Sequence, residues 1–399
     1  MAGGRCPVFC SAAYRKNWRV WRPVKFSLFR RADSKMYLLR RSHRTKPEKR
    51  LLARFWSAAF QAWRQETRRI ATLAAFLILV VLLQLFVQVL LNMWNRNFFD
   101  ALGRKEGHVL LRQAELFLPL ATASILLAAA SVWGRMSAQR LWREVLTRRV
   151  LARWLEKDRF RQLTDLMKGS ENPEYRIAVD TRLATDAPID MAVALFTSLL
   201  TSITFFGVLW TVGGDITFVV LDTKITVPGY LVIGVIVYSG SISGLMLLFG
   251  RHLTSVSERM SQTEAEFRAA VDAVRTQNGT LESAAGFTAM RQAMQIKLQA
   301  VLLWWREYCW QLVRTTLVSQ GNVLLAPVVA WLLCVPKYLA GAMSLGELTQ
   351  SAAAFVVVQS AFNWLVDNYQ RVADWESAAR RVATLLLALD DLEAREPKP

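Results

Sequence analysis

The chain has 399 residues, of which 53% are hydrophobic and 20% are charged, and its mean hydropathy is +0.22. It is too apolar for an ordinary soluble enzyme and too long for a small disulfide-stapled domain, so the composition indicates a membrane protein. The net charge is +19, but 19 of the 50 basic residues lie in residues 1–69 beside only 3 acidic ones. A nucleic-acid-binding domain would spread its basic surface over its fold, so we expect no nucleic acid partner and a basic segment beside anionic membrane lipid.

Residues 1–50 form this basic arm, which we expect to be cytoplasmic and disordered. Its aromatic residues alternate with arginine and lysine, which would also suit RNA, and Met36 offers a later start to the chain. In residues 51–69, an apolar face at helical spacing predicts an interfacial elbow helix that leads into the membrane, with Leu52, Phe55, Ala59 and Trp63 on that face.

Six stretches are free of charge and long enough to cross a bilayer as helices, at residues 70–91, 116–134, 191–214, 225–250, 315–336 and 348–366. Buried helices of a soluble core rarely run past a dozen residues without a charge, so six spans are the better interpretation. The segments before, between and after the spans alternate between rich and poor in lysine and arginine, and the inner ones also alternate between long and short. The rich segments are 1–69, 135–190, 251–314 and 367–399. Basic residues near span ends stay in the cytoplasm, so both termini are expected there.

The two long inner segments should continue the spans as helices. Apolar residues recur at three- and four-residue steps within 141–160, and a helix from Ile225 to Arg275 would be about 75 Å long. Each extension then meets a break. Asn172 and Pro173 predict the start of a short transverse helix at 173–186, and residues 278–279 predict the second turn.

Several motifs occupy these elements, namely LNMWNRNFFDAL at 91–102, LWREVLTRRVLARWLEKDRF at 141–160, NPEYRIAVDTRL at 172–183 and VPKYLAGAMSLGELTQ at 335–350. With this layout, they resemble the transmembrane domain of exporter-type ABC half-transporters, in a bacterial branch related to the peroxisomal fatty-acyl transporters and the SbmA/BacA peptide importers. The resemblance covers about residues 51–392. It implies an all-α membrane protein with six transmembrane helices, long cytoplasmic extensions and two coupling helices.

Domain bounds and activity follow from this resemblance as expectations. The transmembrane domain should span residues 70–392, with a short tail at 393–399 and no nucleotide-binding domain. Two copies would enclose one cavity and move a peptide, lipid or acyl-type substrate across the bacterial inner membrane by alternating access.

The energy source is left open by the sequence. No GxxxxGK[ST] phosphate-binding loop occurs, so the chain is not expected to be an enzyme, and ATP and magnesium would act only through a partner ATPase. The alternatives are a proton-driven importer of the SbmA/BacA kind and a non-transporting remnant. No acidic residue lies within any span, which weighs against a proton relay. Cysteine and histidine are sparse and scattered, so no metal site is expected.

Candidate site residues fall into two groups. The first elbow (residues 172–186) and the second elbow (residues 275–286) would contact an ATPase through Asn172, Pro173, Arg176, Asp180, Arg182, Arg275 and Gly286. The second elbow departs from the family pattern beyond Arg275 and Gly286, so the ATPase is expected at the first. The second group comprises amides at helical spacing, which would line a translocation cavity or bond between helices, namely Gln84, Gln88, Asn92, Gln320, Asn322, Gln359 and Asn363.

Overall fold

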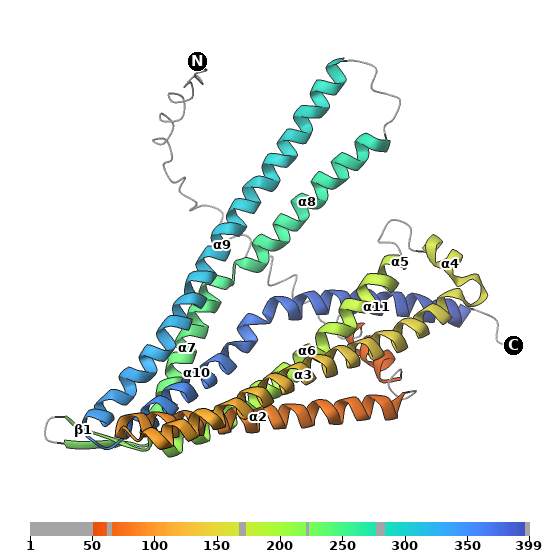
Figure 1. The fold of residues 1–399 in the computed structure, drawn as a ribbon. Coiled ribbons are helices and arrows are strands. Elements are labelled where there is room, and N and C mark those ends of the chain that lie inside the picture. The colour runs from red at the N-terminus through yellow and green to blue at the C-terminus, as the bar shows by residue number, and fades with distance from the viewer. Residues whose placement is uncertain (1–50, 62–65, 167–172, 221–222, 277–283, 396–399) are drawn as a thin grey trace, which may run out of the picture. The chain divides into compact units, whose positions relative to one another are not determined.

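Figure 1 shows a computed structural model of the chain, which describes residues 51–61, 66–166, 173–220, 223–276 and 284–395. The chain divides into two units, residues 1–53 and 54–399. The basic arm at 1–50 lies outside the described residues, so the account below concerns the second unit.

The described part of the chain is almost entirely helical, which confirms the all-α fold class. Its helices are α2 (Thr67–Arg104), α3 (Gly107–Leu155), α4 (Arg159–Leu166), α5 (Pro173–Tyr175), α6 (Thr181–Gly213), α7 (Tyr230–Gly250), α8 (Leu253–Thr276), α9 (Ala284–Leu339), α10 (Leu345–Asp367) and α11 (Tyr369–Arg395). A 3₁₀ turn at Glu156–Asp158 follows α3, and a π-helical turn at Arg176–Asp180 joins α5 to α6. The elbow helix occupies residues 51–61.

Five helical stretches are long and apolar enough to cross a membrane, by length and composition, at Thr67–Arg104, Gly107–Leu163, Pro173–Gly213, Tyr230–Val274 and Phe287–Leu339. The sixth expected span lies in α10, which is outside that set. Its amides Gln350, Gln359 and Asn363 lower its apolarity. The count of six crossings therefore stays a prediction.

One helix lies at the centre of the fold. Helix α10 packs against α2, α6, α7 and α9, and α3 packs against α2 and α6. The fully buried side chains of Phe205, Leu209, Val235 and Phe355 belong to one apolar cluster that joins α6, α7 and α10. Between helices of a membrane bundle, close van der Waals packing of such side chains holds the helices together.

The short connections gather at one end of the bundle, at the lower left of Figure 1. There, Arg96 in α2 forms an ion pair with Glu347 in α10 (2.8 Å), and the Lys337 ammonium in α9 donates to the Gly213 carbonyl of α6. This common end agrees with the strict alternation of long and short connections expected from the sequence.

One of these connections is a β-hairpin that the sequence analysis missed. Strands β1 (Ile216–Val220) and β2 (Thr223–Val227) pair antiparallel, with Ile216 opposite Val227. The span expected from residue 225 therefore begins as a strand, and α7 begins only after Gly229, whose φ is +58°. A run of β-branched residues favours the strand over the first turn of a helix.

Two helices continue far beyond membrane length. Helix α3 has 49 residues and α9 has 56, so at 1.5 Å per residue they measure about 74 and 84 Å, against roughly 30 Å of hydrocarbon. The single helix expected from Ile225 to Arg275 is wrong, because the hairpin precedes it and a break follows Gly250. Glycine is a weak helix former, and the Gln311 side chain donates to the Phe249 carbonyl at this break.

The opposite end of the bundle is closed by the C-terminal helix. Along α11 one face is fully buried, at Ala378, Ala379, Val382, Ala383, Leu385 and Leu389. Beside it lies an aromatic cluster made of Phe55, Trp56, Trp142 and Trp375, with neighbouring ring centroids 5.8–6.5 Å apart. Trp56 belongs to the elbow helix, so this helix packs against α3 and α11 through its aromatic face.

Candidate functional site

A cleft lined by both polar and apolar side chains opens between four helices of the bundle, with a volume of about 430 Å³. Helices α2, α3, α6 and α10 contribute its lining, which consists of Gln84, Gln88, Ser131, Arg135, Val193, Ala194, Thr197, Ser198, Thr201, Val357, Ser360, Ala361 and Trp364. We call it the inner cleft. Amides and hydroxyls at membrane depth are costly unless they are paired or face a cavity, so this arrangement suits a solute path.

Two of the seven predicted cavity residues lie in the inner cleft. Gln84 and Gln88 are four residues apart, and α2 places both on the face that lines it. Asn92, one turn further, is instead buried, and its amide nitrogen donates to the Gln350 carbonyl of α10 (3.2 Å). Asn92 therefore joins two helices, as the interhelical alternative anticipated.

The remaining four amides lie apart from the inner cleft. Gln320 is exposed on α9, and Asn322 is buried and accepts a hydrogen bond from the Tyr238 hydroxyl (3.1 Å). In α10, Gln359 is buried and Asn363 is half-buried. A cavity-lining role for these four stays a prediction.

A second cleft, of about 620 Å³, lies at the end that carries the short connections. Arg96, Asp100 and Arg104 in α2 line it, together with Gln350 in α10. The Asp100 carboxylate accepts a hydrogen bond from the Gly346 amide at the start of α10 (2.8 Å). Arg96 and Asp100 both contact α10, and sequence reasoning had placed none of the charged lining residues in a cavity.

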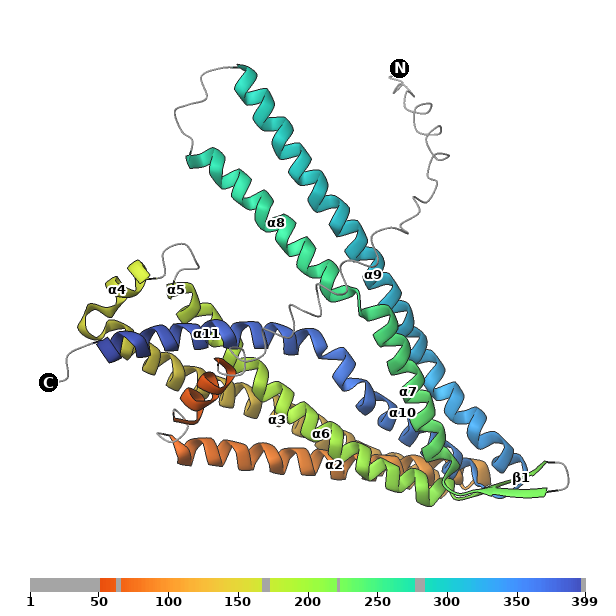
Figure 2. The ribbon, with the colours of Figure 1, turned by 180° about the vertical axis from the view of Figure 1, so that it is seen from behind.

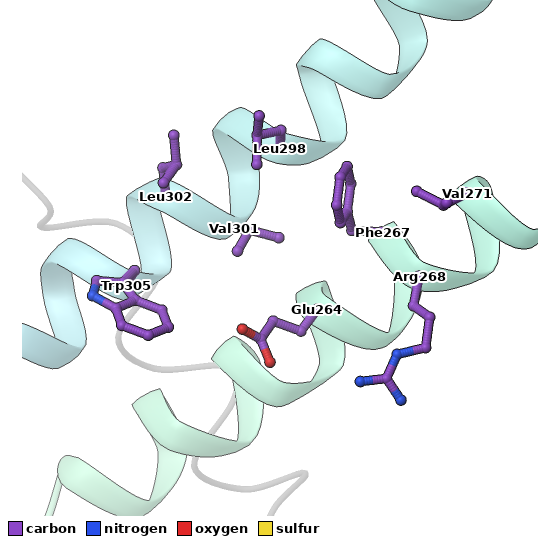
Figure 3. A pocket seen from close by; sticks show the side chains of 8 residues that line it. All are labelled: Glu264, Phe267, Arg268, Val271, Leu298, Val301, Leu302 and Trp305. Carbon is purple, nitrogen blue, oxygen red and sulfur yellow. The ribbon is translucent and has the colours of Figure 1, made fainter.

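Helices α8 and α9 form a groove of about 660 Å³ between their facing sides. Figure 3 shows Phe267, Leu298 and Val301 between the two helices, while Glu264 points from α8 toward this space and Arg268 points away from it. Several apolar side chains of α9 next to the groove stay exposed, at Leu298, Leu302, Leu303 and Trp305. In contact with water, such a face would call for a partner.

The first elbow differs from its expected form. Residues 173–186 do not make a separate transverse helix, because Tyr175, Asp180 and Thr181 all keep right-handed helical angles and α5, the π-helical turn and α6 run on without a break. A π-helical turn, which adds one residue to the helix, accommodates the motif instead. The short element here is α4 (Arg159–Leu166).

The residues of the first elbow differ in their exposure to solvent. Pro173, Arg176 and Asp180 are buried, whereas Arg182 is exposed. Tyr175, which sequence reasoning did not select, is 55% exposed. Asn172 lies outside the described residues. A docking partner can reach Tyr175 and Arg182 but cannot reach the Asp180 carboxylate.

The second elbow falls largely at 277–283, outside the described residues. Arg275 is in the last turn of α8 and Gly286 in the first turn of α9. The coupling role of both elbows stays a prediction.

The buried carboxylate of Asp180 is held by the C-terminal helix. Arg381 donates to both of its oxygens (2.8 Å each), and Asp180 is 0% exposed. Higher along the same interface, the Trp375 indole donates to the Ala184 carbonyl (3.2 Å) and Arg371 pairs with Asp190 (3.1 Å). These contacts run antiparallel along α6 and α11 and join the first elbow to the C-terminal helix.

A second set of ion pairs holds the far end of α11. The Asp390 carboxylate accepts hydrogen bonds from Arg54 of the elbow helix (2.6 and 2.7 Å) and from Arg153 of α3 (2.6 Å). Burial alone would raise the pKa of Asp390, but the hydrogen bonds and positive charges of Arg54 and Arg153 outweigh it and hold that pKa below its usual value of 3.8. Folding therefore favours the ionised carboxylate.

Acid should loosen this end of α11. Because the pKa of Asp390 is lowered by folding, its stabilising contribution is present above about pH 4 and is lost as the pH falls through the folded-state value. Asp390→Asn should lower the free energy of unfolding by about 2 kcal/mol at pH 7. It should also flatten the decline of the thermal midpoint below pH 4, measured in detergent. Parallel declines in both proteins would contradict this role.

The comparisons with known proteins agree with this architecture. The sequence model of the family described as ABC transporter transmembrane region 2 matches residues 60–339. The chain is 25% identical over 362 residues to the Inner membrane ABC transporter ATP-binding protein YddA of Escherichia coli, covering 87% of this chain and 63% of that protein. It is 22% identical over 353 residues to the chloroplastic ABC transporter D family member 2 of Arabidopsis thaliana, covering 88% and 47%. The chain thus spans about half to just under two thirds of these relatives.

Proposed function

Because the chain belongs to the family of ABC transporter transmembrane region 2, we propose that it is the membrane-spanning part of a transporter driven by an ATP-binding unit outside residues 1–399. As an integral membrane protein it would lie in the bacterial inner membrane with both ends in the cytoplasm. It would move a peptide, lipid or acyl-type substrate by alternating access. These residues would bind no nucleotide, metal or other cofactor themselves.

The inner cleft is the observation that carries this proposal. It lies between α10 and three helices of membrane length, and amide and hydroxyl groups line it together with apolar side chains, while no acidic residue is among its described lining residues. An open cleft with amide and hydroxyl groups on several helices suits a solute path better than a closely packed bundle would. The lack of an acid among the lining residues favours ATP over a proton gradient, since a proton relay needs ionisable groups along the path.

The exposed apolar side chains of α9 along the α8–α9 groove favour a homodimer. Figure 2 shows the long pair α8–α9 from behind, and the apolar side chains of α9 beside the groove are uncovered within one chain. A second copy that packs on this face would bury them, and the two copies together would enclose one cavity.

The test uses everted membrane vesicles from cells that express the native locus, and follows uptake of a fluorescent hexadecanoate and of a fluorescent peptide. We expect accumulation of one probe that requires ATP and stops with vanadate. Tyr175→Ala should lower the ATP-dependent rate about tenfold or more, because an exposed aromatic residue is a common anchor of protein interfaces. Tyr338→Ala, which changes a tyrosine 38% exposed at the other end of the bundle, is the matched control.

Three outcomes would contradict the proposal. Uptake that collapses with a protonophore while ATP is maintained would establish a proton-driven carrier. Uptake equal to that of a deletion strain would indicate a non-transporting protein. An unchanged rate in Tyr175→Ala, with both variants equally abundant in the membrane, would refute docking at the first elbow.

A further inference from the structure

The chain turns back on itself between α3 and α4, at residues 156–158, which we call the corner. Lys157 has a φ of +52° and a ψ of +37°, and Asp158 has a φ of +55°. These left-handed angles bring the Cβ atom close to the following carbonyl oxygen, so residues other than glycine adopt them rarely and then singly. Two such residues in succession are strained backbone, which persists only where the surrounding contacts hold it.

The sequence through the corner favours a straight helix. Residues 150–166 contain no glycine, proline or asparagine, and most of them are good helix formers. The end of α2 is different, because there a single left-handed residue, Lys105, is followed closely by glycine and its amide donates to the Leu102 carbonyl (3.1 Å). Helix α3 instead ends on Glu156 in an extended conformation, with a φ of −68° and a ψ of +132°. Local preference and observed structure therefore conflict at the corner, which is typical of functional or strained sites.

One arginine holds the corner in its bent form. The Arg159 side chain is 4% exposed, and its guanidinium donates to the Arg153 carbonyl at the end of α3 (3.3 Å) and pairs with Glu156 (3.2 Å). Its third partner is the Glu393 carboxylate of α11 (3.0 Å), which also pairs with the Arg153 guanidinium (2.8 Å). A buried guanidinium needs its counter-charges, so the bent corner depends on the end of α11.

The bent form gives up contacts that a straight helix would keep. It interrupts the helical hydrogen bonds at residues 156–158 and leaves the Leu155 side chain 59% exposed beside the corner. In exchange, α4 packs against α11 and the Leu163 side chain becomes fully buried. The balance between the two forms is therefore set by whether α11 is in place.

We propose that the corner is a switch with two states, controlled by the end of the C-terminal helix. While Glu393 holds Arg159, the corner is bent and α4 packs on α11. When the end of α11 moves away, residues 155–160 become helical and join α3 to α4. The ion pair between Arg159 and Glu393 exists in the first state alone, which is the differential contact that a conformational change requires.

This switch goes beyond the proposed function, because its two states exchange without substrate or ATP. It gives the end of α11 a means to move α4, the helix that precedes the first elbow in the chain. A failure of ATP-driven transport would leave the switch intact, so the two proposals can fail separately.

Hydrogen–deuterium exchange, followed by mass spectrometry, tests the switch in the full chain purified in phosphatidylcholine nanodiscs. The wild type should exchange quickly in peptides that cover residues 155–162, because the helical hydrogen bonds are interrupted there. In Glu393→Ala we expect this exchange to become slower by about tenfold or more, because the released corner gains helical hydrogen bonds. Arg159→Gln removes the same ion pair from the other side and should also slow the exchange. An ion pair that only fastens a loop would have the opposite effect, since its loss would speed the exchange.

A glycine separates a gain of helix from other causes of protection. Glycine adopts left-handed angles without strain and is a weak helix former, so Lys157→Gly added to Glu393→Ala should restore the rapid exchange. Glu376→Ala is the matched control, because Glu376 is also on α11, is 39% exposed as against 38% for Glu393, and pairs with Arg380 of its own helix. It should exchange like the wild type at residues 155–162.

Two results would overturn the proposal. The first is exchange at residues 155–162 that is unchanged or faster in Glu393→Ala or in Arg159→Gln, whichever of the two gives folded protein. The second is slow exchange that persists when Lys157→Gly is added, since that protection could not come from a straightened corner.

Discussion

Gly346→Ala should be the most destabilising single-methyl change in the described bundle. A Cβ at this position would lie 2.1 Å from the Arg96 carbonyl oxygen and 2.6 Å from the carboxyl carbon of Asp100. Neither group can move away easily, because the Arg96 carbonyl belongs to the backbone and the Asp100 carboxylate accepts the hydrogen bond of the Gly346 amide. Overpacking typically lowers the free energy of unfolding by roughly 1–3 kcal/mol, and by more where the backbone must move. We therefore expect a loss of about 3 kcal/mol, or a failure of α10 to pack on α2.

The measurement is the thermal midpoint of the purified protein in detergent. Gly207→Ala in α6 is the control, since a Cβ there would meet nothing within 4 Å and alanine favours a helix. It should melt at or slightly above the wild-type temperature. If Gly346→Ala melted with it, the close approach of α2 and α10 would be wrong.

Replacement of Arg381 by alanine should lower the free energy of unfolding by about 3 kcal/mol. The replacement of its partner Asp180 by asparagine should lower it by less. Arg381→Ala removes both donors to the Asp180 carboxylate, which is fully buried and cannot turn to water. Asp180→Asn leaves Arg381, which is partly exposed and can be solvated, so its effect should be smaller. Removing one member of a buried pair typically costs 3–5 kcal/mol.

A double-mutant cycle measures the interaction energy between Asp180 and Arg381 apart from the contacts that each makes with other residues. Asp180→Asn combined with Arg381→Gln should cost clearly less than the two single changes added together. The exposed pair Glu144–Arg148 provides the comparison and should show a coupling of about 0.3–0.5 kcal/mol. Strict additivity at Asp180 and Arg381 would show that the interaction does not stabilise the fold.

The helices of the bundle could be predicted from the sequence because a charge-free run of membrane length is a strong local signal. The positions of Gln84 and Gln88 followed in the same way, since residues four apart share a helix face. The start of α10 also carried a local signal that was overlooked. Ser344 and Glu347 form reciprocal side-chain to backbone hydrogen bonds, the capping box that the sequence Ser-Leu-Gly-Glu predicts.

The parts that could not be predicted depend on contacts between distant residues. Asp180 and Arg381 are 201 residues apart, and no periodicity links them, so Asp180 was assigned to a docking surface although it is buried. Arg135 follows the second span directly and was counted only as a boundary charge. The hairpin at Ile216–Val227 was missed because a search for apolar helices does not register the two-residue alternation of strands.

The aromatic cluster beside the C-terminal helix has an optical consequence. The Trp56 ring lies 6.3 Å from that of Trp142 and 6.1 Å from that of Trp375, so three indoles from the elbow helix, α3 and α11 are close enough to share their electronic excitation. Ordered aromatic side chains give near-ultraviolet circular dichroism that is lost when packing is lost. The near-ultraviolet circular dichroism of these indoles should therefore report, without a label, whether α11 is packed against α3 and the elbow helix.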